Sequence, residues 1–183
     1  MICLRAVCGL LVAGLALLAS GCKDILQPSL PAATQEGKDT FGCLLDGKTW
    51  LPTRKHTLDD ILEGHVAGNK LFGLKAEDNY TPANFYLSIA DSTGIKPGTY
   101  PLRAGFEGSY DVVQGGSTAW YLSGAANQGR LTITKFEPFA RTGPSGAIVK
   151  GAIVSGTFEF TASSSGSQTI TVREGRFDVN AYQ

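Results

Sequence analysis

Apolar and polar residues alternate with a period of two in several short stretches of this chain, which is the side-chain repeat of a β-strand. The alternation is clearest over residues 84–90, where Phe85, Leu87 and Ile89 share one phase. Comparable stretches recur from residue 40 to 183, between turns that contain Gly, Asp or Pro. The pattern predicts an all-β fold: a single antiparallel β-sandwich or flattened barrel whose core contains Phe85, Leu87 and Ile89.

Turn residues divide the predicted domain, residues 40–183, into about ten strands. The expected strands run over residues 41–45, 48–52, 70–76, 84–90, 99–102, 109–113, 118–123, 130–136, 151–162 and 168–179. Residues 57–64 leave two alternatives open. Thr57 and Asp60 have the spacing of a helix capping box, whereas the same stretch could be a strand running into His65.

Two local features refine the prediction. Asp46-Gly47 is typical of a tight hairpin turn, and Cys43 falls on the more apolar face of the strand before it, so its thiol is expected to be buried. Pro101 has no amide hydrogen to donate to a neighbouring strand, which predicts an edge strand there.

The last expected strand changes phase. Ile170 and Val172 share one face. Phe177 and Val179 also alternate, but one residue out of step with that pair. One extra residue at Glu174-Gly175 would restore the alternation, so we predict a glycine bulge or a tight bend at that point.

The first residues have the features of a cleavable signal peptide. Arg5 supplies a positive charge, and the thirteen residues from Ala6 to Leu18 are apolar or small. As a helix they would extend about 20 Å, short of the roughly 30 Å hydrocarbon core of a bilayer, which favours a signal peptide over a membrane span. The sequence Leu-Ala-Ser-Gly-Cys that ends at Cys22 resembles the lipobox of bacterial lipoproteins. We therefore predict a signal peptide over residues 1–21 and lipid on Cys22; the alternative is an ordinary signal peptide or an uncleaved anchor.

The charge and cysteine content of the processed chain narrow the function classes. The full chain has 16 basic and 16 acidic residues, and removal of residues 1–21 takes only Arg5, which leaves a net charge near −1. Such a chain lacks the basic surface of nucleic-acid-binding proteins, so no nucleic-acid partner is expected. Cys3 and Cys8 leave with the signal peptide and Cys22 is lipidated, so Cys43 has no partner for an intrachain disulfide.

Residues 22–39 contain two prolines and no sustained periodicity, and they are predicted to be a lipidated flexible tether. Lys23-Asp24, directly after the lipidated cysteine, resembles the charged signals that send some Bacteroidota lipoproteins to the outer face of the outer membrane. The expected location is the cell envelope, lipid-anchored at the outer membrane, on its periplasmic or surface face.

A wider resemblance lies in the C-terminal half, in the succession of residues 129–136, 154–162 and 170–179 (GRLTITKF, VSGTFEFTA and ITVREGRFDV). Together with the opening Phe41-Gly42-Cys43 to Trp50 segment, it resembles a family of Bacteroidota lipoproteins catalogued as a domain of unknown function. The resemblance covers most of residues 40–183. The resemblance implies a lipid anchor and a β architecture, and it implies no particular activity.

No catalytic constellation is evident. His56 and His65 are the only histidines, and the chain has no Gly-x-Ser-x-Gly elbow. A pair of carboxylates for glycoside cleavage would have to come from different strands. The candidates are Glu107, Asp111, Glu159 and Asp178. The sequence therefore predicts no catalytic residue and no cofactor.

A metal site is not predicted either. The candidate ligands are His56, Asp59, Asp60, Glu63 and His65. They lack the His-Glu-x-x-His spacing of zinc sites, and a solvated acidic segment is the preferred interpretation.

Four aromatic residues are the candidate ligand-binding residues, because flat apolar rings can stack on sugar rings. They are Trp50, Tyr110, Trp120 and Tyr121. Trp120 and Tyr121 are adjacent on a strand, so only one can face the core; the alternative is that Trp50 and one of this pair are core residues. We expect a non-enzymatic envelope protein that binds a glycan, a peptide or a partner protein. An envelope or surface hydrolase and a structural subunit of an outer-membrane assembly are the other two hypotheses.

Overall fold

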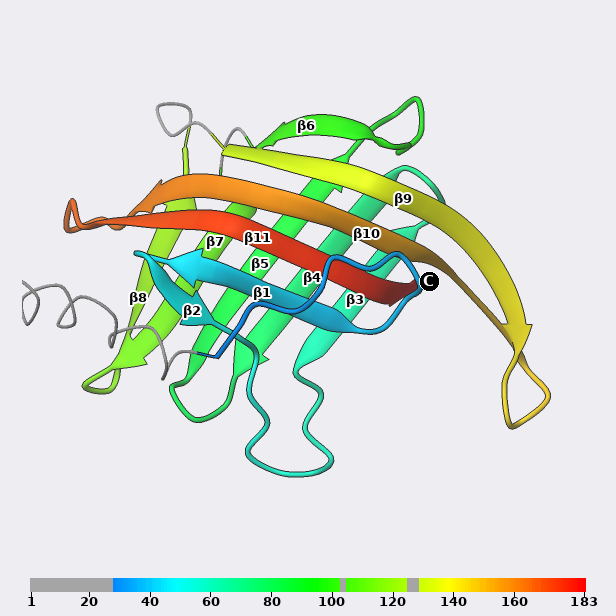
Figure 1. Ribbon diagram of the computed structural model, residues 1–183, viewed down its shortest axis with the longest axis horizontal. Helices are drawn as coiled ribbons and strands as arrows, with labels where there is room; N and C mark the ends of the chain where they lie inside the picture. The colour runs from blue at the N-terminus through cyan, green and yellow to red at the C-terminus, as the bar shows by residue number, and fades with distance from the viewer. Residues whose placement is uncertain (1–27, 103–104, 125–128) are drawn as a thin grey trace, which may run out of the picture.

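The computed structural model of the chain describes residues 28–102, 105–124 and 129–183. The predicted signal peptide and Cys22 lie outside the described residues. Within them every regular element is a β-strand, which confirms the all-β prediction (Figure 1). No described segment forms a helix with the length and apolar character needed to cross a bilayer.

The strands are β1 (Thr40–Leu45), β2 (Lys48–Trp50), β3 (Leu62–Ala67), β4 (Leu71–Asp78), β5 (Ala83–Ala90), β6 (Gly98–Leu102), β7 (Gly105–Gln114), β8 (Ser117–Ser123), β9 (Gly129–Thr142), β10 (Ile148–Ser163) and β11 (Thr169–Tyr182). They form one 11-stranded sheet in the order β2-β1-β11-β3-β4-β5-β7-β8-β10-β9-β6, with a further pairing of β10 and β11. All neighbours are antiparallel except β11 and β3. Pro101 lies in β6, the last strand of this order, as its missing amide hydrogen predicts.

The sheet folds over into two layers. In Figure 1, β1, β9, β10 and β11 cross in front of β3, β4, β5, β7 and β8. The layers join on one side through two parallel pairs between β11 and β3, and on the other through the single pair Ser163 and Leu122. This arrangement is consistent with the predicted sandwich or flattened barrel.

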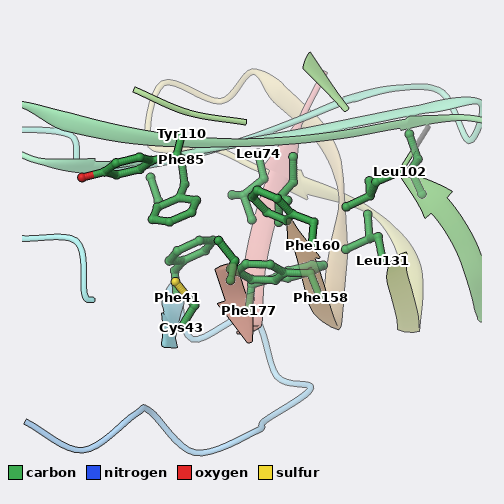
Figure 2. Close-up of a cluster of buried hydrophobic side chains, with 14 of the residues drawn as sticks. Phe41, Cys43, Leu74, Phe85, Leu102, Tyr110, Leu131, Phe158, Phe160 and Phe177 are labelled. Atoms are coloured by element: carbon green, nitrogen blue, oxygen red, sulfur yellow. The ribbon is translucent and has the colours of Figure 1, made fainter. Parts of the chain in front are cut away.

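The core between the layers is rich in phenylalanine. Figure 2 shows Phe85 and Tyr110 from one layer facing Phe41, Phe158 and Phe177 from the other. The ring of Phe85 has its centroid 5.8 Å from that of Phe41 and 4.8 Å from that of Tyr110. Phe85, Leu87 and Ile89 are all buried, which confirms the phase read from the sequence.

The first hairpin also matches its prediction. Asp46 and Gly47 have φ angles of 49° and 79°, the left-handed conformation that a two-residue hairpin turn requires. Across the turn Cys43 pairs with Trp50. Cys43 is fully buried, and burial raises the pKa of its thiol to about 12, which keeps it protonated and inert.

The predicted bulge is present in β11. Along β10, Phe158 pairs with Gly175 and Phe160 with Val172, so two steps on β10 correspond to three on β11. Strand β1 shows the same extra residue on its side of β11. The left-handed residue of this bulge is Glu174, with a φ of 51°, and not Gly175 as a glycine bulge would require, and the alternation resumes correctly beyond it.

The ambiguous stretch forms no helix. Residues 57 and 58 form a turn, and β3 begins at Leu62. The Asp59 carboxylate stabilises that turn by accepting hydrogen bonds from the backbone N–H groups of Lys55 and His56. Local hydrogen bonds to an aspartate therefore replace the helical capping box that the sequence suggested.

The predicted flexible tether is wrong for residues 28–39. This segment, here called the strap, lies along β11 and is joined to it by hydrogen bonds (Figure 1, dark blue). Asp178 is the centre of the contact: its buried carboxylate accepts hydrogen bonds from Thr34 Oγ1 at 2.6 Å and from Ser155 Oγ at 2.7 Å. Three backbone N–H groups of the strap also donate to it, those of Glu36, Gly37 and Lys38.

These bonds determine the protonation of Asp178. Burial alone would raise the pKa of its carboxyl, but the hydrogen bonds favour the charged form more strongly and lower that pKa to about 2. The strap is therefore held by an ionised carboxylate from the opposite end of the chain.

Candidate functional site

The outer face of the β3–β4–β5 layer carries the side chains of the phase opposite to the core. Lys75 on β4 lies between Glu63 on β3 and Tyr86 on β5, each directly in register with it. In the next register position Gly73 is flanked by His65 and Ser88. Strand alternation thus brings two short cross-strand rows together on one surface.

A groove of about 450 Å³ opens on this surface. It is lined by Glu63, His65, Gly73, Leu74, Lys75, Tyr86, Leu87, Ser88 and Trp120. Gly73 forms part of its floor, since a Cβ atom there would have no atom within 4 Å. The missing side chain leaves space beside the larger neighbours, and the volume falls in the range typical of small-molecule sites.

Two stacked aromatic rings form one wall of the groove. The centroids of Tyr86 and Trp120 are 6.1 Å apart and their planes are 25° from parallel. Trp120 is 42% exposed, although most large aromatic side chains of the described residues are buried or half-buried. Trp120, backed by the half-buried Tyr86, thus presents a partly exposed flat apolar surface on which another ring can stack.

A buried carboxylate lies beneath this aromatic pair. Asp111 on β7 pairs directly with Asn84 on β5 and with Trp120 on β8. Both of its oxygens lie within hydrogen-bond distance of the Asn84 side-chain amide nitrogen, at 3.3 and 3.1 Å, and it also accepts a hydrogen bond from Tyr86. Burial raises the pKa of Asp111 and outweighs these hydrogen bonds. Asp111 therefore orients Tyr86 from below.

The charges around the groove are unbalanced. Lys75 forms ion pairs with Glu77 and, at 4.0 Å, with Glu63; the hydrogen bond to Glu77 is the main reason why the pKa of Lys75 is raised. Three carboxylates, those of Glu63, Glu77 and Asp111, thus surround one ammonium group. Of these groups only Glu63 and Lys75 line the groove, together with the His65 imidazole, so the excess of carboxylates lies beside the groove.

The structure does not bring the four predicted aromatic residues together. Trp50, Tyr110 and Tyr121 point into the core and are at most 9% exposed. Trp120 points outward, as the alternation with Tyr121 requires. The prediction of a shared platform is therefore wrong for three of its members, and the core alternative holds for Trp50 and Tyr121.

Tyr86 is the site residue that sequence reasoning missed. It occupies the polar phase of residues 84–90, the stretch with the clearest alternation. A large aromatic ring in the solvent-facing phase was the sequence signal that could have identified Tyr86 as a site residue. No sequence signal indicated its stacking on Trp120, because β5 and β8 lie close together, on either side of β7, only in the folded sheet.

The candidate metal ligands and carboxylates named from the sequence lie in separate parts of the molecule. Glu63 and His65 line the groove, while Asp59 belongs to the turn before β3. Across residues 28–102, 105–124 and 129–183, no three His, Cys, Asp or Glu side chains are grouped so as to hold a metal ion. Asp111 and Asp178 lie on different layers, the latter enclosed by the strap. Glu159 forms an exposed ion pair with Arg130 at 2.6 Å.

Comparison of the chain with protein-family models, with curated proteins and with solved structures gave no match. Its function has to be inferred from its own sequence and geometry.

Proposed function

We propose that this chain is a lipid-anchored bacterial envelope protein that binds a glycan, without catalysis, in the groove between Trp120 and Glu63. The observation that carries this proposal is the stack of the exposed Trp120 on the half-buried Tyr86, beside the open floor at Gly73. An exposed tryptophan ring is a surface that a flat ligand can cover, and sugar rings combine an apolar face with a rim of hydroxyl groups.

Polar groups for those hydroxyls surround the aromatic wall. Ser88, Lys75 and Glu63 line the same groove and offer both donors and acceptors. Sites for small ligands commonly combine an apolar surface with a few converging polar groups. The groove surface is mostly apolar with these few polar side chains, which suits a ligand that has both an apolar face and hydroxyl groups.

Retention on immobilised glycans tests this part of the proposal. The wild-type chain should be retained, and Trp120→Ala should lose retention. Tyr80→Ala is the matched control, because Tyr80 is an exposed aromatic residue in the turn between β4 and β5, outside the groove. Retention that survives Trp120→Ala, or is lost equally in Tyr80→Ala, would contradict the proposal.

Anchoring is proposed from the sequence features that end at Cys22. Hydrogen bonds hold the strap on the domain from Pro31 onward, so the chain from Cys22 to that point spans at most about 30 Å when fully extended. The groove would then work close to the membrane surface. Radiolabelled palmitate should enter the wild-type chain, and incorporation that persists in Cys22→Ser would refute the anchor.

A further inference from the structure

The charge around the groove distinguishes between classes of saccharide. Glu63 lies on its surface and Glu77 and Asp111 lie beside it, against the Lys75 ammonium, which Glu77 and Glu63 already engage, and the His65 imidazole. Three carboxylates remain in excess even over a protonated imidazole together with this ammonium. A uronate, sulfated or phosphorylated sugar would meet net repulsion there, whereas a sugar with a protonated amine would meet net attraction.

The spacing of the groove places one carboxylate where such an amine could reach it. Glu63 and Tyr86 lie on either side of Lys75 in register, so their backbones are about 10 Å apart, twice the spacing of neighbouring strands. A sugar ring stacked on Tyr86 and Trp120 therefore leaves room for a neighbouring unit over Gly73. The side chain of Glu63 is 53% exposed and its carboxylate is 4.0 Å from the Lys75 ammonium, so it can turn toward that unit.

We infer that the ligand is an amino-bearing, cationic saccharide, with one ring stacked on Trp120 and an ammonium group of the next unit paired with Glu63. This inference rests on the proposed function, because it assigns a ligand class to the same groove. The aromatic wall adds to the preference, since an ammonium group near the face of a tryptophan or tyrosine ring is attracted to it.

The test compares trisaccharides of equal length at pH 5.5, using the full chain purified in detergent. The three probes are the trimers of glucosamine, N-acetylglucosamine and galacturonate, and calorimetry gives the dissociation constant of each. The glucosamine trimer should bind about fivefold more tightly than its acetylated form, the amount expected of one partly exposed charge pair. The galacturonate trimer should bind most weakly.

Glu63→Gln removes the charge and keeps the shape of the side chain. It should reduce the preference for glucosamine over N-acetylglucosamine to less than twofold while leaving the affinity for the acetylated trimer unchanged. Glu137→Gln is the control, because Glu137 is an exposed carboxylate on β9, away from the groove. Its ligand preference should equal that of the wild type.

Gly73→Val tests the location of the site independently of charge. A Cβ at residue 73 meets nothing within 4 Å, so the side chain should fill the groove without disturbing the strand, and binding of every trimer should be lost with the melting temperature unchanged. Wild-type binding by a folded Gly73→Val variant would overturn the inference.

The remaining outcomes separate the two proposals. Equal affinity for the acetylated and deacetylated trimers, or tightest binding of galacturonate, would overturn the inference and leave glycan binding in place. Failure of all three trimers to bind would overturn both.

Discussion

Asp178→Asn should release the strap and destabilise the fold. The carboxylate accepts hydrogen bonds from Thr34, from Ser155 and from three consecutive backbone N–H groups of the strap. An asparagine at this position has no charge, and its amide nitrogen would face donors instead of acceptors. The expected loss of unfolding free energy is about 3 kcal/mol, which corresponds to a fall of roughly 10 °C in melting temperature for a domain of this size.

The pH dependence of stability gives a second, independent value for the contribution of the Asp178 carboxylate. The pKa of Asp178 is about 2 in the folded chain, against about 3.9 for an unfolded aspartate, so ionisation contributes about 2.5 kcal/mol of stability at pH 7. Because the folded pKa is the lower one, this contribution is complete above about pH 5 and is lost as the pH falls through 4 toward 2. The difference in stability between wild type and variant should shrink over the same interval.

Differential scanning calorimetry at several pH values between 2 and 7 measures both effects, and hydrogen exchange at residues 36–38 reports release of the strap. Asp60→Asn is the control, because Asp60 is exposed. A melting temperature of Asp178→Asn within 2 °C of the wild type at pH 7 would refute the reasoning. So would a difference that does not change with pH.

Three further predictions concern the described core and the bulge. Gly175→Ala should lower the unfolding free energy by about 2 kcal/mol in chemical denaturation, because its Cβ would lie 2.5 Å from the Phe158 ring; a neutral result would contradict the packing there. Glu174→Gly should raise the stability by about 1 kcal/mol by the same measurement, since glycine adopts a φ of 51° without strain, and a loss would argue against the bulge geometry. Cys43 should resist iodoacetamide at pH 8 in the native chain and react only after unfolding, because burial raises its pKa to about 12; mass spectrometry of the peptide checks this, and rapid native labelling would refute it.

Features that depend on neighbouring residues could be predicted from the sequence. The phase of Phe85, Leu87 and Ile89 follows from strand geometry alone, and Asp46-Gly47 forms its turn through its own backbone preferences. The bulge at Glu174-Gly175 was visible because it shifts an otherwise regular pattern.

Features that depend on distant partners could not be predicted. The strap reads as a flexible segment because its stabilising contact, Asp178, lies more than 140 residues away. Asp178 itself sits on the outward side of β11, where a carboxylate gives no sign of being buried. Likewise, Tyr86 and Trp120 become neighbours only because β5, β7 and β8 are adjacent in the sheet.

Tryptophan fluorescence tests the binding groove most directly, because the chain has two tryptophans in opposite environments. Trp120 is 42% exposed in the groove, whereas Trp50 is 9% exposed in the core. In Trp50→Phe the glucosamine trimer should shift the emission of Trp120 to shorter wavelength and protect it from acrylamide quenching. In Trp120→Phe the same titration should leave the emission of Trp50 unchanged. An unaltered Trp120 signal at saturating saccharide, or a response from Trp50 alone, would contradict binding at this groove.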